Sequence, residues 1–354
     1  MPGVDGTVTG TEVDEVAAGA GDGAATGATP AAERRRDLNP AQAEVLAALG
    51  ARPDERPAFD PRLRHALRAE LEERLSPIAE TVPDGEVLWV GKGLLSGVHG
   101  CEGLFLAREA EEFAWTPAIA RGMVAHKAIE LSLSWRGDPA PALLVEEAIA
   151  RLVETDRSLG PYLAALGEGE RAELHGEATE RVSMFQECFP PLEPRWRPVP
   201  ESRLRADLCA DRIVLSGKVD LTVGRADGVR AGKVLVDLKT GGFSPGHIDD
   251  LRFYALLETL RVGTPPRLLA TYYLDGGRLQ EEPVTEGLLQ ATVERVVRGI
   301  AAAVQLRRGE RPPQLRPGPP CRWCPVAADC GPGRQWIEAR DDADGWTAVS
   351  LDDA

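Results

Sequence analysis

The chain has 354 residues, of which 43% are hydrophobic and 27% charged, so it can bury a core as one large domain or two modest ones. Its formal net charge is −15. Residues 1–33 hold six acids and no base, and residues 338–354 hold six acids and one base. These two segments carry most of the charge, so composition neither supports nor excludes a nucleic-acid partner.

Other function classes are easier to exclude from the sequence. No apolar run reaches the roughly 18 residues of a membrane span, and no basic segment followed by an apolar run opens the chain. A Gly-x4-Gly-Lys-(Ser/Thr) phosphate loop is absent, so we expect no ATP site. Six cysteines are too few for a disulfide scaffold. We therefore expect a cytoplasmic protein without a membrane segment.

The N-terminal part divides into a tail and a helical segment. Residues 1–36 are Gly, Ala, Thr and acid with few large apolar residues, which is typical of disorder. Residues 37–86 contain two helical patterns, one beginning at Leu38 and one over residues 61–80. We treat 37–86 as a helical N-terminal segment.

The main domain is expected over residues 87–336, with a helical insertion at about 138–190. Apolar spacing, turn residues and prolines predict its elements in chain order. They are a strand at 87–90, helices at 117–135, 141–156 and 168–187, strands at 212–223 and 233–239, a helix at 248–261, a strand at 268–274 and a helix at 285–308. Five prolines within 190–200 predict a stiff linker. Residues 337–354 are expected to form a second acidic tail. The order indicates an α/β core with a largely helical N-terminal half.

The two predicted strands at 212–223 and 233–239 carry two carboxylates and a lysine that could form one site. Asp237 and Lys239 are two residues apart, so a strand places both on one face, and pairing through the turn at 226–228 brings Asp220 to the same end of the sheet. Converging carboxylates repel each other unless a cation separates them, and oxygen ligands suit Mg²⁺ or Mn²⁺. A salt-bridged surface hairpin is the alternative, although Asp237 lies in an apolar run where an unpaired charge is costly.

Four motifs in this region resemble a known family. Gly122–His126, Gly217–Asp220, Val236–Gly241 and Asp250–Ala255 resemble, in type, spacing and order, the RecB-type branch of the PD-(D/E)XK nuclease superfamily. The resemblance spans residues 96–330. It implies a restriction-endonuclease-like α/β fold, in which a mixed sheet is flanked by helices.

The resemblance also implies roles for individual residues. His126, Asp220, Asp237 and the backbone carbonyl of Leu238 would bind the metal, Lys239 would position the attacking water, and Tyr254 would belong to the catalytic set. Asp250 stands where relatives usually carry Gln, so its role is open between metal binding and solvent exposure. We expect Glu130 to be a surface carboxylate, and Glu201 is a weaker candidate for the site.

Three of the six cysteines are crowded into Cys321-x2-Cys324-x5-Cys330. Thiolates at such spacing hold a tetrahedral metal or an iron–sulfur cluster and require a fourth ligand. The segment from Ser96 to Phe105 resembles the start of the iron–sulfur nucleases of the same family, the AddB-type and CRISPR-associated spacer-acquisition exonucleases. This resemblance implies that Cys101 is the fourth ligand of a [4Fe-4S] cluster that ties together the two ends of the domain.

Alternatives remain for these features. A Zn²⁺ site with His99 as a ligand and a set of unligated thiols are the alternatives to the cluster. We expect Cys188 and Cys209 to be structural thiols. Arg307, Arg308, Arg311 and Arg316 form a basic stretch that we expect at a solvated helix end.

The sequence therefore predicts a metal-dependent DNA nuclease, directed to single strands or ends, in repair or recombination. Its partners would be DNA with free ends and a helicase or repair protein. The alternatives are a catalytically weakened nuclease fold that binds DNA or joins a complex, and a CRISPR-adaptation nuclease.

Overall fold

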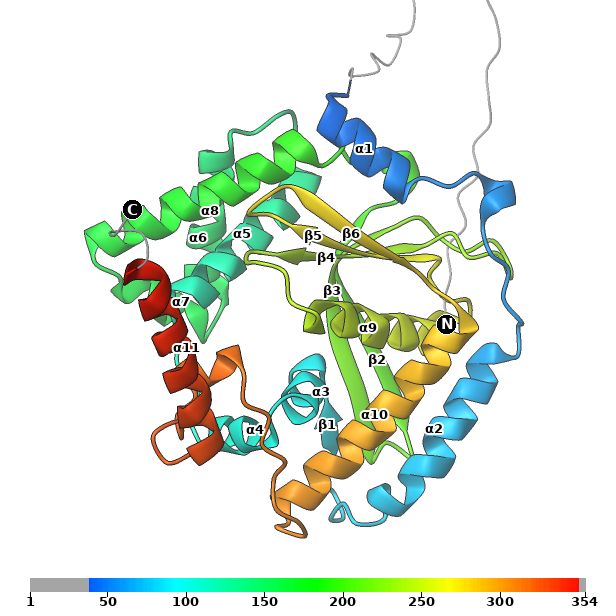
Figure 1. Ribbon diagram of the computed structural model, residues 1–354. Coiled ribbons are helices and arrows are strands. Elements are labelled where there is room, and N and C mark those ends of the chain that lie inside the picture. Colours follow the sequence, from blue (N-terminus) through cyan, green and yellow to red (C-terminus); the bar gives the residue numbers. More distant parts are fainter. Residues whose placement is uncertain (1–37, 350–354) are drawn as a thin grey trace, which may run out of the picture. The chain divides into compact units, whose positions relative to one another are not determined.

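A mixed β-sheet forms the centre of the fold (Figure 1). The computed structural model describes residues 38–349, and their side chains as far as Asp341. Within that range the strands are β1 (Leu88–Val90), β2 (Val199–Leu208), β3 (Ile213–Val223), β4 (Val234–Lys239), β5 (Leu268–Tyr273) and β6 (Arg278–Pro283). They pair in the order β1-β3-β4-β5-β6, and β2 pairs with β3. The expected 1–36 tail lies outside the described residues.

Antiparallel and parallel pairs alternate across the sheet. β3 pairs antiparallel with β2 and β4, whereas β1–β3 and β4–β5 are parallel. β5 and β6 are antiparallel. The predicted turn between β3 and β4 is present, with Arg230 N–H donating to Asp227 O at 2.9 Å and Gly228 at a φ of 55°. The expected mixed sheet flanked by helices is confirmed.

Helices cover both faces of the sheet (Figure 1). Their bounds are α1 (Pro40–Leu49), α2 (Leu63–Ala79), α3 (Lys92–His99), α4 (Glu102–Glu109), α5 (Pro117–Ser134), α6 (Pro141–Thr155), α7 (Leu159–Ala165), α8 (Glu168–Cys188), α9 (Gly246–Val262), α10 (Glu286–Arg307) and α11 (Gly331–Val349). Short 3₁₀ turns occur at η1 (Pro53–Glu55), η2 (Pro194–Trp196) and η3 (Pro319–Trp323). Among the described residues, no helix is both long and apolar enough to cross a membrane.

Successive side chains of β4 point to opposite faces of the sheet, and each face packs into its own apolar core. Leu235 packs with α2, α9 and α10 on one face, and Val234, Val236 and Leu238 pack with α5, α6, α7 and α8 on the other. Because α2 packs into the first core, the N-terminal helical segment joins the same body as the sheet. Burial on both faces explains why Val234–Lys239 reads as a nearly continuous apolar run.

The structure departs from the sequence-based elements in several places. β2 begins at Val199, inside the segment expected to be a stiff linker, and β6 is a strand that the polar sequence did not reveal. α3, α4 and α7 were likewise not predicted. α11 continues to Val349, whereas an acidic tail was expected from residue 337. Its acidic composition conceals the helix, because solvated charges are compatible with both states.

Candidate metal centre and cysteine cluster

α5 carries His126 toward the sheet. Thr116 caps this helix by accepting a hydrogen bond from Ile119 N–H at 3.3 Å, and Pro117 occupies its first turn. Gly122 lies against the end of β4, where an added Cβ would be 2.9 Å from Thr240 Oγ1. A larger residue at this position would require the Thr240 side chain or the helix to shift. His126 follows one turn later and reaches β3.

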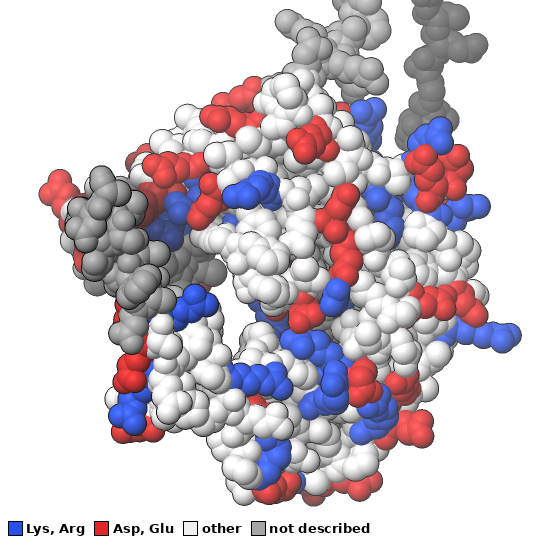
Figure 2. Space-filling view, viewed as in Figure 1, with Lys and Arg blue, Asp and Glu red and all other residues white. Residues whose placement is uncertain are grey.

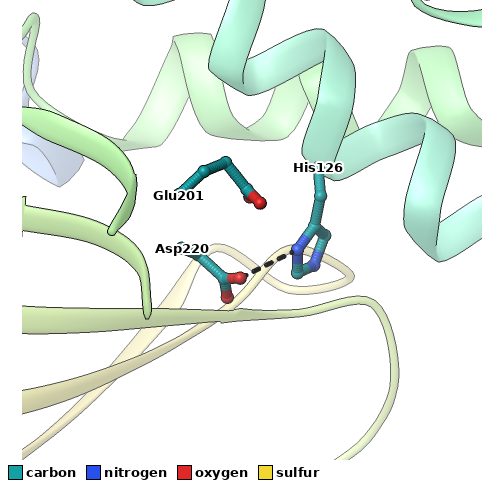
Figure 3. A group of neighbouring side chains, drawn as sticks. All are labelled: His126, Glu201 and Asp220. Atoms are coloured by element: carbon teal, nitrogen blue, oxygen red, sulfur yellow. Dashed lines mark hydrogen bonds and ion pairs between the residues drawn. The ribbon is translucent and has the colours of Figure 1, made fainter. Parts of the chain in front are cut away.

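His126, Glu201 and Asp220 converge on one point (Figure 3). The His126 Nδ1 atom lies 3.2 Å from Asp220 Oδ1, and Asp220 Oδ2 accepts a hydrogen bond from Leu238 N–H at 2.7 Å. One ligand atom from each of the three side chains lies within 4.8 Å of the others. An imidazole and two carboxylates at this spacing form a donor set that fits a divalent cation.

Glu201 has an unusual backbone. Its φ is 52°, in the left-handed region, although it lies inside strand β2. It falls between the pairs Pro200–Leu221 and Ser202–Val219, which places it opposite Asp220. A non-glycine residue in that region is strained by about 1–3 kcal/mol. The strain accompanies the turning of the carboxylate toward His126, and Glu201 also pairs with Lys218.

The charges of His126 and Asp220 are coupled. Burial alone would raise the pKa of Asp220, but the adjacent His126 imidazolium and the Leu238 N–H lower it overall. Burial alone would lower the pKa of His126, and Asp220 reverses this so that its pKa is raised. Each group therefore favours the charged form of the other, and the proximity of the imidazolium offsets the negative charge of Asp220.

Asp237 and Lys239 share the face of β4 that carries Leu235, next to α9, and they lie near Lys92 of α3. Lys239 Nζ lies 2.7 Å from Asp237 Oδ2 and 3.5 Å from Asp250 Oδ2. Asp237 does not belong to the group of three ligand atoms around His126. Its Oδ2 is buried and makes no hydrogen bond of normal geometry despite the lysine. Burial and the nearby Asp220 raise the pKa of Asp237.

Lys92 is a second cation at this centre. It begins α3, and its Nζ lies 3.5 Å from Asp250 Oδ2 and 3.9 Å from Asp237 Oδ1. The same Nζ sits 5.5 Å from the centroid of the Tyr254 ring. Burial alone would lower the pKa of Lys92, but Asp237 and Asp250 raise it overall. Sequence reasoning missed Lys92 because it lies more than a hundred residues before Asp237 and belongs to no motif.

Asp250 and Tyr254 are placed by α9. Asp250 is bonded to both lysines and is not solvent-facing, since only 13% of its side chain is exposed. Tyr254 is 2% exposed, and burial followed by the nearby Asp237 raises its pKa. Its ring packs against Gly217, where an added Cβ would lie 2.4 Å from Tyr254 Cε1. Tyr254 therefore packs between Gly217 of β3 and the Lys92 side chain.

Four cysteines line one cavity of about 310 Å³. They are Cys101 before α4, Cys321 and Cys324 around η3, and Cys330 before α11. Arg316 N–H donates to Cys101 Sγ at 3.4 Å, and Gly318 N–H donates to Cys321 Sγ at 3.4 Å. Among the described residues, no three Sγ atoms lie within 4.8 Å of one another. A tetrahedral Zn²⁺ site with bonds of 2.3 Å would require sulfur separations of about 3.8 Å.

The other candidates for this region lie elsewhere. His99 Nε2 is 2.8 Å from Arg295 O, and His99 does not line the cysteine cavity. Cys188 contacts Met184, and Cys209 contacts Glu72 O at 3.7 Å. Glu130, expected as a surface carboxylate, is half-buried and forms an ion pair with Lys127 at 2.9 Å.

An ion pair joins the two sides of the cysteine cavity. Arg311 donates to both oxygens of Glu102, at 2.6 and 2.8 Å, and Glu102 also accepts from Gln314 N–H at 2.7 Å. Glu102 is 5% exposed. The basic stretch was expected at a solvated helix end, but Arg311 forms an ion pair with Glu102 and Arg307 forms one with Glu109. Sequence reasoning missed Glu102, whose only signal is its position beside Cys101.

Comparisons with known proteins identify a family and several structures. The sequence profile of the PD-(D/E)XK nuclease superfamily matches residues 95–331. No curated protein matches the chain. Among solved structures, the chain is similar to the "Putative exonuclease" of Eubacterium rectale, with 13% identity, a TM-score of 0.42, and coverage of 69% of this chain and 88% of that one. It is also similar to Rai1 of Scheffersomyces stipitis, with 10% identity, a TM-score of 0.23, and coverage of 72% and 69%.

Proposed function

Because the chain belongs to the PD-(D/E)XK nuclease superfamily, we propose that it is a metal-dependent deoxyribonuclease acting on single strands or strand ends in DNA repair or recombination. The observation that carries the proposal is the convergence of His126, Glu201 and Asp220 beside a strand that presents Asp237 and Lys239. This arrangement combines a cation site with a lysine suited to water activation.

The proposed ligands come from four elements. His126 of α5, Glu201 of β2 and Asp220 of β3 would hold Mg²⁺ or Mn²⁺, with Asp237 and the Leu238 carbonyl completing the set. When bound, the ion would polarise the phosphodiester and lower the pKa of a bound water. The donor set supports the fit, because an imidazole nitrogen and two carboxylate oxygens within 4.8 Å of one another match the ligands of a divalent cation.

The two lysines would stabilise negative charge on the reacting phosphate. Lys239 would orient the water and stabilise the negative charge that develops on the phosphate oxygens. Asp250 pairs with both Lys92 and Lys239, so Lys92 offsets part of the negative charge that Asp250 places near Lys239. On the face drawn in Figure 2, the surface is hollowed by an opening, and Lys and Arg side chains gather along its lower edge. Such an edge attracts a polyanionic strand.

A cleavage assay tests the proposal. The protein is mixed with a labelled single strand, either linear or circular, in Mn²⁺, in Mg²⁺ and with chelator. We expect cleavage with a metal and none with chelator, and degradation restricted to the linear strand would assign end-directed action. A protein that is pure, cluster-loaded and inert with both metals would overturn the proposed activity.

One observation favours a second candidate, a weakened nuclease fold that binds DNA without cutting it. Asp250 replaces the expected Gln and brings a second carboxylate within 3.5 Å of Lys239. A lysine that pairs with two carboxylates is less free to contact a water or a phosphate oxygen. Binding of the labelled strand without cleavage would favour this candidate.

We further propose that Cys101, Cys321, Cys324 and Cys330 hold a [4Fe-4S] cluster. The cavity shared by the four thiols and the wide Sγ spacing suit a group larger than one ion. The N–H groups aimed at Cys101 and Cys321 would stabilise thiolates. The cluster would be structural, because it joins the chain before α4 to the chain after α10, and a link between such distant segments restricts the unfolded state most.

Purification without oxygen tests the cluster. The protein should be brown, with broad absorption near roughly 400 nm. Cys101→Ser should lose the colour, whereas the matched Cys188→Ser should keep it. Iron binding by Cys101→Ser at the wild-type level would overturn the four-cysteine assignment, and stoichiometric Zn²⁺ without iron would support the rival zinc site.

A further inference from the structure

A second cavity lies at the opposite end of β4 from Lys239. It has a volume of about 420 Å³ and is bordered by the end of α1, by η2, by the first residue of β4 and by Arg267, which precedes β5. Val234 lines it, and Lys239 is five residues further along the strand. At a rise of 3.3 Å per residue, the two strand positions are about 16 Å apart. The cavity is therefore separate from the metal centre.

Arginines dominate the charged side chains of this cavity. No Asp or Glu lines it, and the arginines that do are Arg56, Arg195, Arg197, Arg225 and Arg267. Within the described part of the chain, Arg195 forms an ion pair with Glu193, and the other four form none. Several guanidinium groups around one hollow create a positive potential that favours anions.

Two of these guanidinium groups have buried donors that are not satisfied. The Nε atoms of Arg56 and Arg267 are inaccessible to solvent and have no hydrogen-bond partner in the described structure. Their other donors reach only backbone oxygens, from Arg56 to Ala51 O at 3.4 Å and from Arg267 to Leu49 O. Burial and the like charge of Arg56 lower the pKa of Arg267. Buried, unpaired cationic donors are costly, and an anion would relieve that cost.

The backbone keeps this hollow open. A Cβ at Gly232 would lie 3.0 Å from Arg56 Nη1 and 1.9 Å from Arg225 O, so only glycine leaves room for both. Trp196 also lines the cavity and is half-buried, which offers an apolar face beside the charges. The volume lies in the range of pockets that enclose small ligands.

We propose that this cavity binds a phosphate-bearing ligand of nucleotide size through Arg56, Arg225 and Arg267. Guanidinium groups recognise phosphate with paired hydrogen bonds, and Trp196 can stack against a base. The phosphate could belong to a free nucleotide or to the end of a nucleic-acid strand, since both present the same group. The site requires no metal and no cleavage, so it does not depend on the proposed nuclease activity.

Calorimetric titration of the full chain in chelator tests the proposal. The probes are inorganic phosphate, dAMP, and a short oligonucleotide with or without a 5′-phosphate. Arg225→Gln is the main variant because Arg225 is exposed, and Arg56→Gln is the second. Arg157→Gln is the matched control, an exposed arginine outside the cavity.

The proposal predicts saturable binding of a phosphate probe that weakens at least about tenfold in each cavity variant and is unchanged in the control. Binding of dAMP in preference to the oligonucleotide would assign a free nucleotide, and binding restricted to the 5′-phosphorylated oligonucleotide would assign a strand end. Absence of binding by every probe, or equal binding by Arg225→Gln, Arg56→Gln and wild type, would overturn the site.

Discussion

Gly217 of β3 provides a test of how tightly Tyr254 and Leu257 of α9 pack against the sheet beside the metal centre. A Cβ at this position would lie 2.4 Å from Tyr254 Cε1, 2.8 Å from Tyr254 Cδ1 and 3.4 Å from Leu257 Cδ1. Tyr254 and Leu257 are 2% and 0% exposed, so the ring cannot move aside into solvent. Gly217→Ala should therefore lower the free energy of unfolding by about 1–3 kcal/mol, the usual cost of overpacking.

Urea unfolding of the metal-free protein, followed by circular dichroism, measures this loss. The matched control is Gly176→Ala in α8, where an added Cβ meets nothing within 4 Å. Because alanine is favoured in an exposed helix, this control should gain about 0.5–1 kcal/mol. In Gly217→Ala/Tyr254→Ala the clash is gone, so the double variant should lose less than the sum of the two single losses. Full stability of Gly217→Ala, or strict additivity, would refute the reasoning.

The remaining predictions concern the two centres. Lys92→Met should slow single-turnover cleavage by about tenfold or more, because Asp250 then competes for Lys239; an unchanged rate would remove Lys92 from the site. Gly122→Ala should weaken Mn²⁺ binding by pushing α5 away from Thr240, which calorimetry measures, and wild-type affinity would contradict the close approach. Glu102→Gln should lower the thermal midpoint by several degrees. Hydrogen bonds from Arg311 lower the pKa of Glu102, so this difference should be present above the unfolded-state pKa of about 4.3 and vanish as the pH falls through the lower folded-state value. A difference that persists in acid would contradict the assignment.

The hairpin that carries the metal centre could be predicted because its signals are local. Period-two alternation marks β3 and β4, and the spacing of Asp237 and Lys239 fixes their common face. The helix with Gly122 and His126 has its own cap and proline signal. β3 and β4 are consecutive strands, and their connection contains the turn at Asp227–Arg230, so their pairing can be expected from one stretch of sequence.

Other parts of the centre depend on contacts that no local pattern contains. Pro198 and Pro200 favour a linker, so the strand β2 was not expected, and Glu201 was only a weaker candidate for the site. Lys92 reaches Asp237 only because α3 packs beside α9. The bond between Glu102 and Arg311 joins residues more than two hundred positions apart. Tertiary packing decides each of these contacts.

The central claim is that one cation site and one lysine act together on a phosphodiester. Mn²⁺ binding and cleavage of a labelled single strand, measured on the same preparations of Lys239→Ala and Asp220→Asn, test it most directly, with Asp227→Asn in the exposed turn as the control. We predict that Lys239→Ala binds Mn²⁺ but does not cleave, that Asp220→Asn loses both properties, and that the control keeps both. Near-wild-type cleavage by Lys239→Ala or by Asp220→Asn would contradict the account.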